Sequence, residues 1–257
     1  MARREGLTEA PRSPWRRAAQ ALTQLVLPRV CAACEEALDD SDTGIICGRC
    51  WARVPMLRSP RCDRCGHPRR ARGECAGCAL LPPYVRAARS YCWVPDDVSS
   101  AILSALKYDG WPAAAGEIGL RLARLEWPPD VVLERAALLP VPLAAVKQRA
   151  RGFNQAERLA AAVAEHWRVP VWADALRRTR ATPSQTRLTP GERLANVHGA
   201  FSLGLESHRL QGQHVVLVDD VLTTGATLNA CASALFAAGA RTMSYLTFGR
   251  ARTSADR

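Results

Sequence analysis

Short apolar runs alternate along this chain of 257 residues with longer segments in which apolar positions recur every three or four residues. The runs predict buried strands, and the periodic segments predict helices with one apolar face. Strands are expected at Ala137–Leu143, Val215–Val218 and Arg241–Phe248, and helices at Val98–Lys107, Asn154–Trp167 and Ala226–Ala238. This alternation favours an α/β fold in which helices cover both faces of a parallel sheet.

The distribution of cysteine sets the expected domain boundaries. Eight of the ten cysteines lie between Cys31 and Cys78, and the alternating pattern begins near Tyr84. We expect an N-terminal segment over residues 1–30, a cysteine module over 31–83, an α/β domain over 84–250 that folds without this module, and a polar tail over 251–257. In the first segment, Ser13–Leu27 predicts a short amphipathic helix with Ser13 as its N-cap. No apolar run approaches the length of about 20 residues that a membrane-spanning helix needs.

The cysteine module consists of four C-x-x-C pairs. They are Cys31 and Cys34, Cys47 and Cys50, Cys62 and Cys65, and Cys75 and Cys78. A C-x-x-C knuckle places two sulfurs on one turn, and two knuckles complete a tetrahedral thiolate shell around zinc. The spacing therefore predicts two structural zinc ions, each with four ligands and no open coordination position. The metal would replace the apolar core that so short a module lacks.

Other uses of paired cysteines fit this sequence less well. A disulfide framework is typical of small secreted domains, and no secretory signal is recognisable before Cys31. A redox centre needs one C-x-x-C pair rather than four. Sequential sharing, with Cys31, Cys34, Cys47 and Cys50 around one ion, is the simplest arrangement, but the sequence leaves an interleaved arrangement open.

Residues 215–228 read VVLVDDVLTTGATL, and this ordered run predicts a phosphate site at a turn from strand to helix. In open α/β sheets, ligands bind at the carboxyl ends of strands, and a free helix N-terminus attracts phosphate. Gly225 allows the backbone to approach a ligand closely. Hydroxyl donors come from Thr223, Thr224 and Thr227.

Two adjacent carboxylates, Asp219 and Asp220, precede this loop. Their oxygens can accept hydrogen bonds from ribose hydroxyls and assist a magnesium ion. The chain contains no G-x-x-x-x-G-K-[ST] motif, which excludes a P-loop nucleotidase on motif grounds, and it also lacks the G-x-G-x-x-G fingerprint.

The ordered run of acids, hydroxyls and glycine resembles the phosphoribosyl diphosphate (PRPP) signature of type I phosphoribosyltransferases. Further segments narrow the resemblance to the ComF family of competence-associated phosphoribosyltransferase-like proteins, whose members also carry N-terminal cysteine knuckles. These segments are ALKYDG at Ala105–Gly110, LPVPLAAVKQRARGFNQA at Leu139–Ala156, and a polar stretch that ends in GAF at Gly199–Phe201. One departure is Ala144–Val146, where the family often has a His-Pro-basic run.

The resemblance implies a role for each part of the site. Asp219 and Asp220 would hold the ribose hydroxyls and are the candidate catalytic residues. The 5′-phosphate would be held by Val221, Thr223, Thr224, Gly225, Ala226 and Thr227. Pro142–Arg151 would form the loop on the pyrophosphate side, with positive charges from Lys147, Arg149, Arg151 and, from another segment, Lys107. Arg177–Leu203 would be a flexible hood that closes over the substrate.

The implied reaction is the displacement of pyrophosphate from C1 of PRPP by a nucleophile, usually a base nitrogen. Mg²⁺ bound with PRPP and basic side chains would stabilise the negative charge on the leaving pyrophosphate. The hood would exclude water, which otherwise hydrolyses the activated ribose. The carboxylates would position substrate and stabilise charge rather than act as general bases.

A second interpretation keeps the fold and loop as a PRPP or nucleotide sensor in a protein that handles single-stranded DNA. The ComF resemblance points to natural transformation, so single-stranded DNA and the DNA-uptake machinery are candidate partners. The formal charge of +11 is consistent with an anionic partner, although two zinc ions held by eight thiolates would lower it by four. Trp15 and Trp51 lie near arginines and could stack on bases, with packing against the knuckles as the alternative for Trp51.

The expected location is the cytoplasm. It would be close to a membrane if residues 14–27 act as a surface anchor, which is a third interpretation of that segment. The sequence does not indicate the acceptor substrate or the oligomeric state.

Overall fold

The computed structural model describes residues 29–69, 75–108, 112–179 and 199–252. The helix expected at Ser13–Leu27, the residue Trp15, the central part of the expected hood and most of the polar tail lie outside the described residues. None of the described helices is long and apolar enough to cross a membrane.

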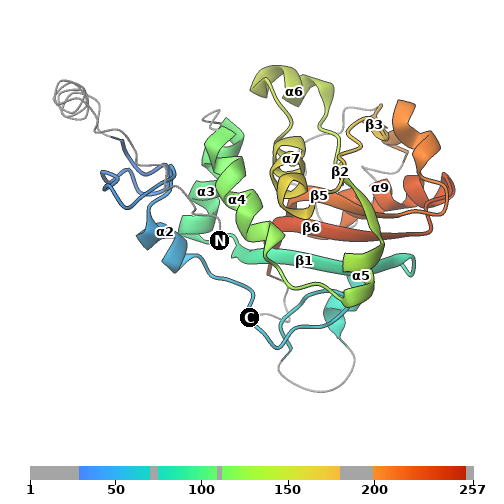
Figure 1. Ribbon diagram of the computed structural model, residues 1–257, viewed down its shortest axis with the longest axis horizontal. Helices are drawn as coiled ribbons and strands as arrows, with labels where there is room; N and C mark the ends of the chain where they lie inside the picture. Colours follow the sequence, from blue (N-terminus) through green and yellow to red (C-terminus); the bar gives the residue numbers. More distant parts are fainter. Residues whose placement is uncertain (1–28, 70–74, 109–111, 180–198, 253–257) are drawn as a thin grey trace, which may run out of the picture.

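Four parallel strands form the central sheet (Figure 1). Their order across the sheet is β1 (Val85–Val94), β6 (Thr242–Ala251), β5 (His214–Leu222) and β2 (Arg135–Pro140). Beyond β2, Val171 adds one parallel bridge to Leu138. The strands β5 and β6 therefore lie at the centre, where both of their edges are paired.

Each face of the sheet meets its own layer of helices. Successive side chains of β5 point to opposite faces. Val216 and Val218 join an apolar core with α3 (Asp97–Tyr108), α4 (Pro112–Ala123) and α7 (Gln155–Trp167). Val215 and Leu217 join a second core with α9 (Ala226–Ala237). The expected parallel sheet with helices on both faces is thus confirmed, and burial on both faces explains the uninterrupted apolar run in β5.

Shorter elements connect these layers. They are α2 (Gly48–Arg53), η1 (Ala76–Leu80), α5 (Pro129–Glu134), α6 (Ala145–Arg151), η3 (Leu205–Arg209) and the antiparallel pair β3 (Leu176–Arg178) and β4 (Phe201–Leu203). The pair β3 and β4 forms the base of the segment expected to be a hood.

The structure differs from the sequence-based expectation at several elements. The pattern did not predict β1, because Arg86, Arg89 and Ser90 interrupt its apolar residues. Arg89 and Ser90 are nevertheless buried, because Arg89 donates to backbone carbonyls and Ser90 bonds Thr247 Oγ1 at 2.7 Å. Polar groups satisfied in this way can lie inside a sheet.

The ends of two strands, β2 and β5, also differ from those expected from the sequence. β2 ends at Pro140 rather than Leu143, and the expected loop after it contains the helix α6. β5 continues past Val218 to Leu222, because β6 pairs with it as far as the partners Leu222 and Arg250.

The cysteine module covers the outer edge of β1. The amide of Leu57 donates to Tyr91 O at 3.0 Å, and the amides of Trp93 and Ala88 donate to Pro55 O and Arg64 O at 2.9 and 2.7 Å. An uncovered edge strand would present unpaired backbone groups to other chains, so this docking protects the sheet.

Side chains of the module also enter the core of the α/β domain. Trp51 is 9% exposed and meets the rings of Tyr91 and Phe248 edge-on, with centroids 6.3 and 6.4 Å away. Its indole Nε1 donates to Glu117 Oε2 at 2.8 Å. Of the two roles considered for Trp51, the structure supports packing.

Candidate functional site

The two acids lie inside β5, near its carboxyl end. Asp219 pairs with Thr247 of β6, and the strand continues two residues beyond Asp220. The amide of Asp220 donates to Asp219 Oδ1 at 2.8 Å. A central strand holds both carboxylates at the sheet edge where ligands of α/β proteins bind.

Lys107 is brought to the acid pair by the helix α3. Its Nζ lies 2.5 Å from Asp220 Oδ2, and the two side chains are 25% and 12% exposed. Lys107 occupies the last turn of α3, where a positive charge also interacts favourably with the helix dipole. The sequence placed Lys107 on the pyrophosphate side, and the structure places it against the carboxylates.

The electrostatics of Asp219 differ from those of an exposed aspartate. Burial, together with the like charge of Asp220, raises the pKa of Asp219 well above its usual range. Lys107 acts in the opposite direction. A cation or a hydrogen-bond donor at this position would favour the ionised form of Asp219.

The loop after β5 leads into the N-terminus of α9. Gly225 caps α9 with a φ of 77°, a left-handed conformation that glycine adopts without strain. A Cβ at this position would lie 3.3 Å from Leu80 O, a tight contact, so Leu80 approaches the loop closely. Thr224 Oγ1 accepts a weak bond from the amide of Ala226 at 3.4 Å, and Thr223 is exposed.

The three candidate charges of the pyrophosphate side lie on α6, which projects beyond the sheet (Figure 1). Lys147 and Arg149 are exposed there. Arg151 is half-buried and donates to Gln155 Oε1 of α7. Among the described residues, the structure thus joins Lys107 to the carboxylates and carries the other three charges on a separate short helix.

Arg178 is a basic residue near the site that the sequence did not single out. It lies on β3, at the base of the expected hood, with its guanidinium 5.4 Å from the ring centroid of Phe201. Burial lowers its pKa, while the fields of Cys231 and Asp219 oppose that shift. Only the pairing of β3 with β4 reveals this position, since in sequence Arg178 is one of several arginines in a polar segment.

The eight paired cysteines form two clusters. Cys31, Cys34, Cys47 and Cys50 make the first zinc cluster, and Cys62, Cys65, Cys75 and Cys78 make the second zinc cluster; within each, the Sγ atoms lie within 4.8 Å of one another. This confirms sequential sharing. In Figure 1, the segment of the first cluster lies at the left next to α2 and α3, and the segment of the second cluster lies on the side of β1 away from β5.

The sulfur geometry fits zinc. A tetrahedral shell with zinc–sulfur bonds of about 2.3 Å separates its sulfurs by about 3.8 Å. In the first cluster, the Sγ atoms of Cys31 and Cys50 are 3.9 Å apart, and those of Cys34 and Cys47 are 3.8 Å apart. In the second, Cys62 and Cys78 are 3.5 Å apart and Cys65 and Cys75 are 3.4 Å apart. These distances are far longer than a disulfide bond.

Backbone amides support the thiolates of the first cluster. The amides of Ala33 and Cys47 lie 3.4 and 3.3 Å from Cys31 Sγ. Although burial raises the pKa of Cys31, these amides outweigh it and bring the value to about 7. A thiol that ionises this readily is well suited to bind metal.

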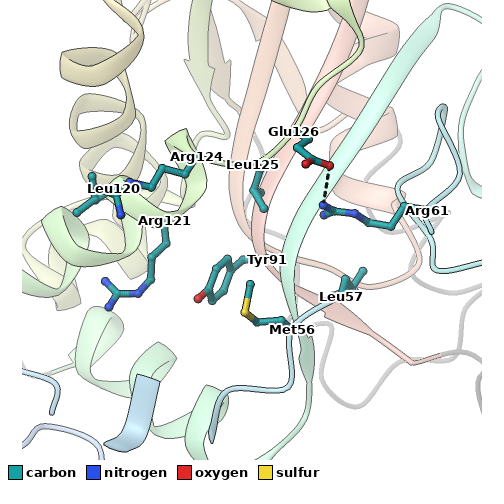
Figure 2. A pocket seen from close by; sticks show the side chains of 9 residues that line it. All are labelled: Met56, Leu57, Arg61, Tyr91, Leu120, Arg121, Arg124, Leu125 and Glu126. Carbon is teal, nitrogen blue, oxygen red and sulfur yellow. Dashed lines mark ion pairs between the residues drawn. The ribbon is translucent and has the colours of Figure 1, made fainter. Parts of the chain in front are cut away.

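A cavity of about 400 Å³ lies between α4, β1 and the segment after α2 (Figure 2). Three arginines line it, but they do not converge. Arg61 is paired with Glu126 at 3.6 Å, Arg121 stacks 3.4 Å from the ring centroid of Trp51, and Figure 2 shows Arg124 extending away from Tyr91. Divergent charges of this kind do not form an anion site.

Both the cysteine module and the α/β domain are similar to known proteins. Residues 22–79 match the double zinc ribbon domain, and residues 146–255 match the phosphoribosyl transferase domain. A DNA utilization protein of Salmonella typhi is 34% identical over 231 residues, which cover 85% of this chain and 96% of that protein. Competence protein F of Haemophilus influenzae is 38% identical over 93 residues, covering 36% of this chain and 41% of the relative. Competence protein ComFC of Bacillus subtilis is 24% identical, covering 76% and 79%.

The chain belongs to the ComF family. The ComF resemblance of the motifs is thereby confirmed, as is the type I phosphoribosyltransferase fold behind a zinc ribbon module. Among solved structures, a hypoxanthine phosphoribosyltransferase of Trypanosoma cruzi is 15% identical over 57% of this chain and 79% of its own, with a TM-score of 0.31, which is too low to support a conclusion.

Proposed function

We propose that this ComF protein binds PRPP together with Mg²⁺ and transfers its phosphoribosyl group, with release of pyrophosphate. The observation that carries the proposal is the acid pair at the carboxyl end of β5, followed directly by a glycine-capped helix N-terminus. Carboxylates suit ribose hydroxyls, and free amides suit a phosphate.

Each residue has a distinct role in this proposal. Asp219 and Asp220 accept hydrogen bonds from the 2′ and 3′ hydroxyls of the ribose. The backbone from Val221 to Thr227 holds the 5′-phosphate, with hydroxyl donors from Thr223, Thr224 and Thr227. Lys107 pairs with Asp220 and holds its carboxylate in position until the ribose arrives.

The pyrophosphate side of the proposed site is less defined. Lys147, Arg149 and Arg151 would meet the leaving group if α6 and the hood close over the substrate. Mg²⁺ bound with PRPP would neutralise charge on the pyrophosphate, and the hard carboxylate oxygens of β5 are the kind of ligand it prefers. Arg178 would add a positive charge at the base of the hood.

The second candidate function is the handling of single-stranded DNA, with PRPP or a nucleotide as a sensed ligand rather than a substrate. It is favoured by the names of the relatives, which are a DNA utilization protein and competence proteins. In both candidates we place the protein in the cytoplasm, where PRPP and incoming DNA are present together.

Calorimetric titration with PRPP and Mg²⁺ tests the proposed site. Replacing both Asp219 and Asp220 by Asn keeps the size of the side chains but removes their charge. Hydrogen bonds to charged groups contribute about 1.5–3 kcal/mol each, so the affinity should fall by about tenfold or more. Thr224→Val should lower the PRPP affinity by less, because backbone amides still hold the phosphate. Saturable binding that the double substitution leaves unchanged would place PRPP elsewhere.

A second measurement separates the two candidates. The purified protein is screened for PRPP-dependent release of pyrophosphate with free bases and with single-stranded DNA as acceptors. Release with one acceptor class supports transfer. Binding of PRPP without release for any acceptor supports the sensing role, and no binding at millimolar PRPP leaves DNA handling as the leading function.

A further inference from the structure

Arg250 is a fully buried arginine next to the second zinc cluster. It is the penultimate residue of β6, opposite Leu222 of β5, and is 2% exposed. A buried guanidinium is stable only where negative charge or enough hydrogen-bond acceptors surround it. Its surroundings therefore have to supply compensation.

The hydrogen bonds of Arg250 are incomplete. Nη1 donates to Cys65 O at 2.6 Å, whereas Nη2 is buried and has no hydrogen-bond partner among the described residues. Arg89, which contacts the same knuckle, differs in this respect: it donates to the carbonyls of Ala88, Asp63 and Glu126. Carbonyl oxygens thus accept hydrogen bonds from the guanidinium of Arg89, whereas Nη2 of Arg250 has no acceptor among the described residues.

The unpaired donor of Arg250 lies beside a cysteine ligand. A Cβ on Gly77 would be 3.0 Å from Arg250 Nη2 and 3.0 Å from Cys65 Sγ, so these two atoms are at most the sum, 6.0 Å, apart. A side chain at residue 77 would crowd both atoms, so glycine leaves room for them at this position. Gly77 lies between the ligands Cys75 and Cys78, and the absence of its side chain opens the cluster to the guanidinium.

The second zinc cluster has the charge that Arg250 requires. Four thiolates around one Zn²⁺ leave two negative charges, and donors in the outer shell of a metal site hold its ligands in place. We propose that Arg250 is a positioning residue of the second zinc cluster, whose Nη2 takes the Cys65 thiolate as its acceptor when zinc is bound and whose charge offsets part of the charge of the metal-loaded cluster.

This arrangement connects the metal to the proposed phosphate loop. The helix η1, which contains the ligand Cys78, ends at Leu80, and Leu80 O accepts a hydrogen bond from Asn229 Nδ2 of α9 at 2.8 Å. The same carbonyl limits the space at Gly225. Loss of zinc from the second cluster should therefore loosen the loop, a consequence that rests on the proposed function.

The test uses the full chain loaded with zinc and three variants. Arg250→Gln removes the positive charge, and Arg250→Lys keeps it. Arg49→Gln is the control, because Arg49 is next to Cys50 of the first zinc cluster but its side chain is 71% exposed and paired with Glu36. In competition with a chromogenic chelator, R250Q should lower the affinity for one of the two zinc ions by about 10- to 100-fold. R250K should recover part of this loss, and R49Q should match the wild type.

A spectroscopic readout distinguishes a contact with the thiolate from a general packing role. In the cobalt-substituted protein, the thiolate-to-metal charge-transfer band should shift in R250Q and remain unchanged in R49Q. If R250Q does not fold, Gly77→Ala moves the guanidinium away while keeping it, and the band should shift in the same direction. Unchanged zinc affinity and an unchanged band in R250Q, or in G77A if R250Q does not fold, would overturn the proposal.

The connection to the phosphate loop is tested by titration with PRPP. If the wild type binds PRPP, R250Q should bind it more weakly than R49Q does. Equal PRPP affinities would overturn the connection. A wild type that binds no PRPP would contradict the proposed function instead, and the zinc and cobalt measurements would still decide the role of Arg250.

Discussion

Lys107 Nζ lies 2.5 Å from Asp220 Oδ2, an ion pair that joins the last turn of α3 to the carboxyl end of β5. The two residues are far apart in sequence, and neither side chain is more than a quarter exposed. The pair fixes one of the two acids of the proposed ribose site and leaves Asp219 without a cation of its own at this distance among the described residues.

We expect Lys107→Met to destabilise the protein and weaken PRPP binding. The substitution leaves the Asp220 carboxylate in a largely buried position without its partner, which costs about 2 kcal/mol. Unfolding in denaturant measures the stability. Lys147→Met is the matched control, because Lys147 is exposed on α6, and its removal should change stability by no more than about 0.5 kcal/mol. Equal effects of the two substitutions on stability would contradict a special role for the ion pair.

Asp219 should make the protein less stable as the pH rises. Burial and Asp220 raise the pKa of Asp219 in the folded state, so the folded protein holds a proton that the unfolded chain releases near pH 4. Stability should therefore fall as the pH rises from about 4 through the raised pKa. Asp219→Asn should increase the melting temperature at neutral pH, flatten this dependence, and weaken PRPP binding.

Asp130 offers a control of opposite sign for the same measurement. The side-chain hydrogen bond from Arg86 lowers the pKa of Asp130, so its contribution to stability is present above the pKa of the unfolded chain and is lost as the pH falls. Asp130→Asn should therefore not raise the melting temperature at neutral pH. A stabilising effect of both substitutions would show that loss of negative charge in general, rather than the site, is responsible.

Elemental analysis should find two zinc ions per chain in protein purified without added metal. Cys34→Ser and Cys78→Ser each break one cluster and should each leave one ion. Cys92→Ala removes a buried cysteine outside both clusters and should leave two. Because metal binding and folding are one equilibrium in such modules, each broken cluster should also unfold its own ribbon. Protein without zinc and with its cysteines oxidised in pairs would contradict the assignment.

The boundary near residue 84 remains a prediction, and the structure shows what a fragment that begins there would lose. It would lack the segments that bond the outer edge of β1 at Ala88, Tyr91 and Trp93, and the packing of Trp51 on Phe248. We expect the fragment to fold with a lower free energy of unfolding and to self-associate through β1. Denaturant unfolding and size-exclusion chromatography test this, and a fragment without cooperative unfolding would show that the two parts share one core.

Patterns that are local in the chain determined much of this protein. Paired cysteines at fixed spacing predict zinc, because two sulfurs on one turn are a local geometry. The run from Val215 to Thr227 predicts a strand, a loop and a helix, because consecutive residues form all three. The ComF resemblance rests on such local motifs, and the family, the sheet and the two clusters confirm it.

Only the tertiary structure decided the contacts between distant segments. The sequence assigned Lys107 to the pyrophosphate side. It did not predict β1, since the buried arginine and serine of this strand depend on partners elsewhere in the chain. Neither Arg250 at Cys65 nor Asn229 at Leu80 leaves a signal in the sequence. Each is a polar residue in a largely apolar element, and the role of its side chain depends on which segment packs against it. The close approach of the second zinc cluster to the phosphate loop is therefore a property of the packing, because long-range contacts are set by how whole elements bury their apolar faces.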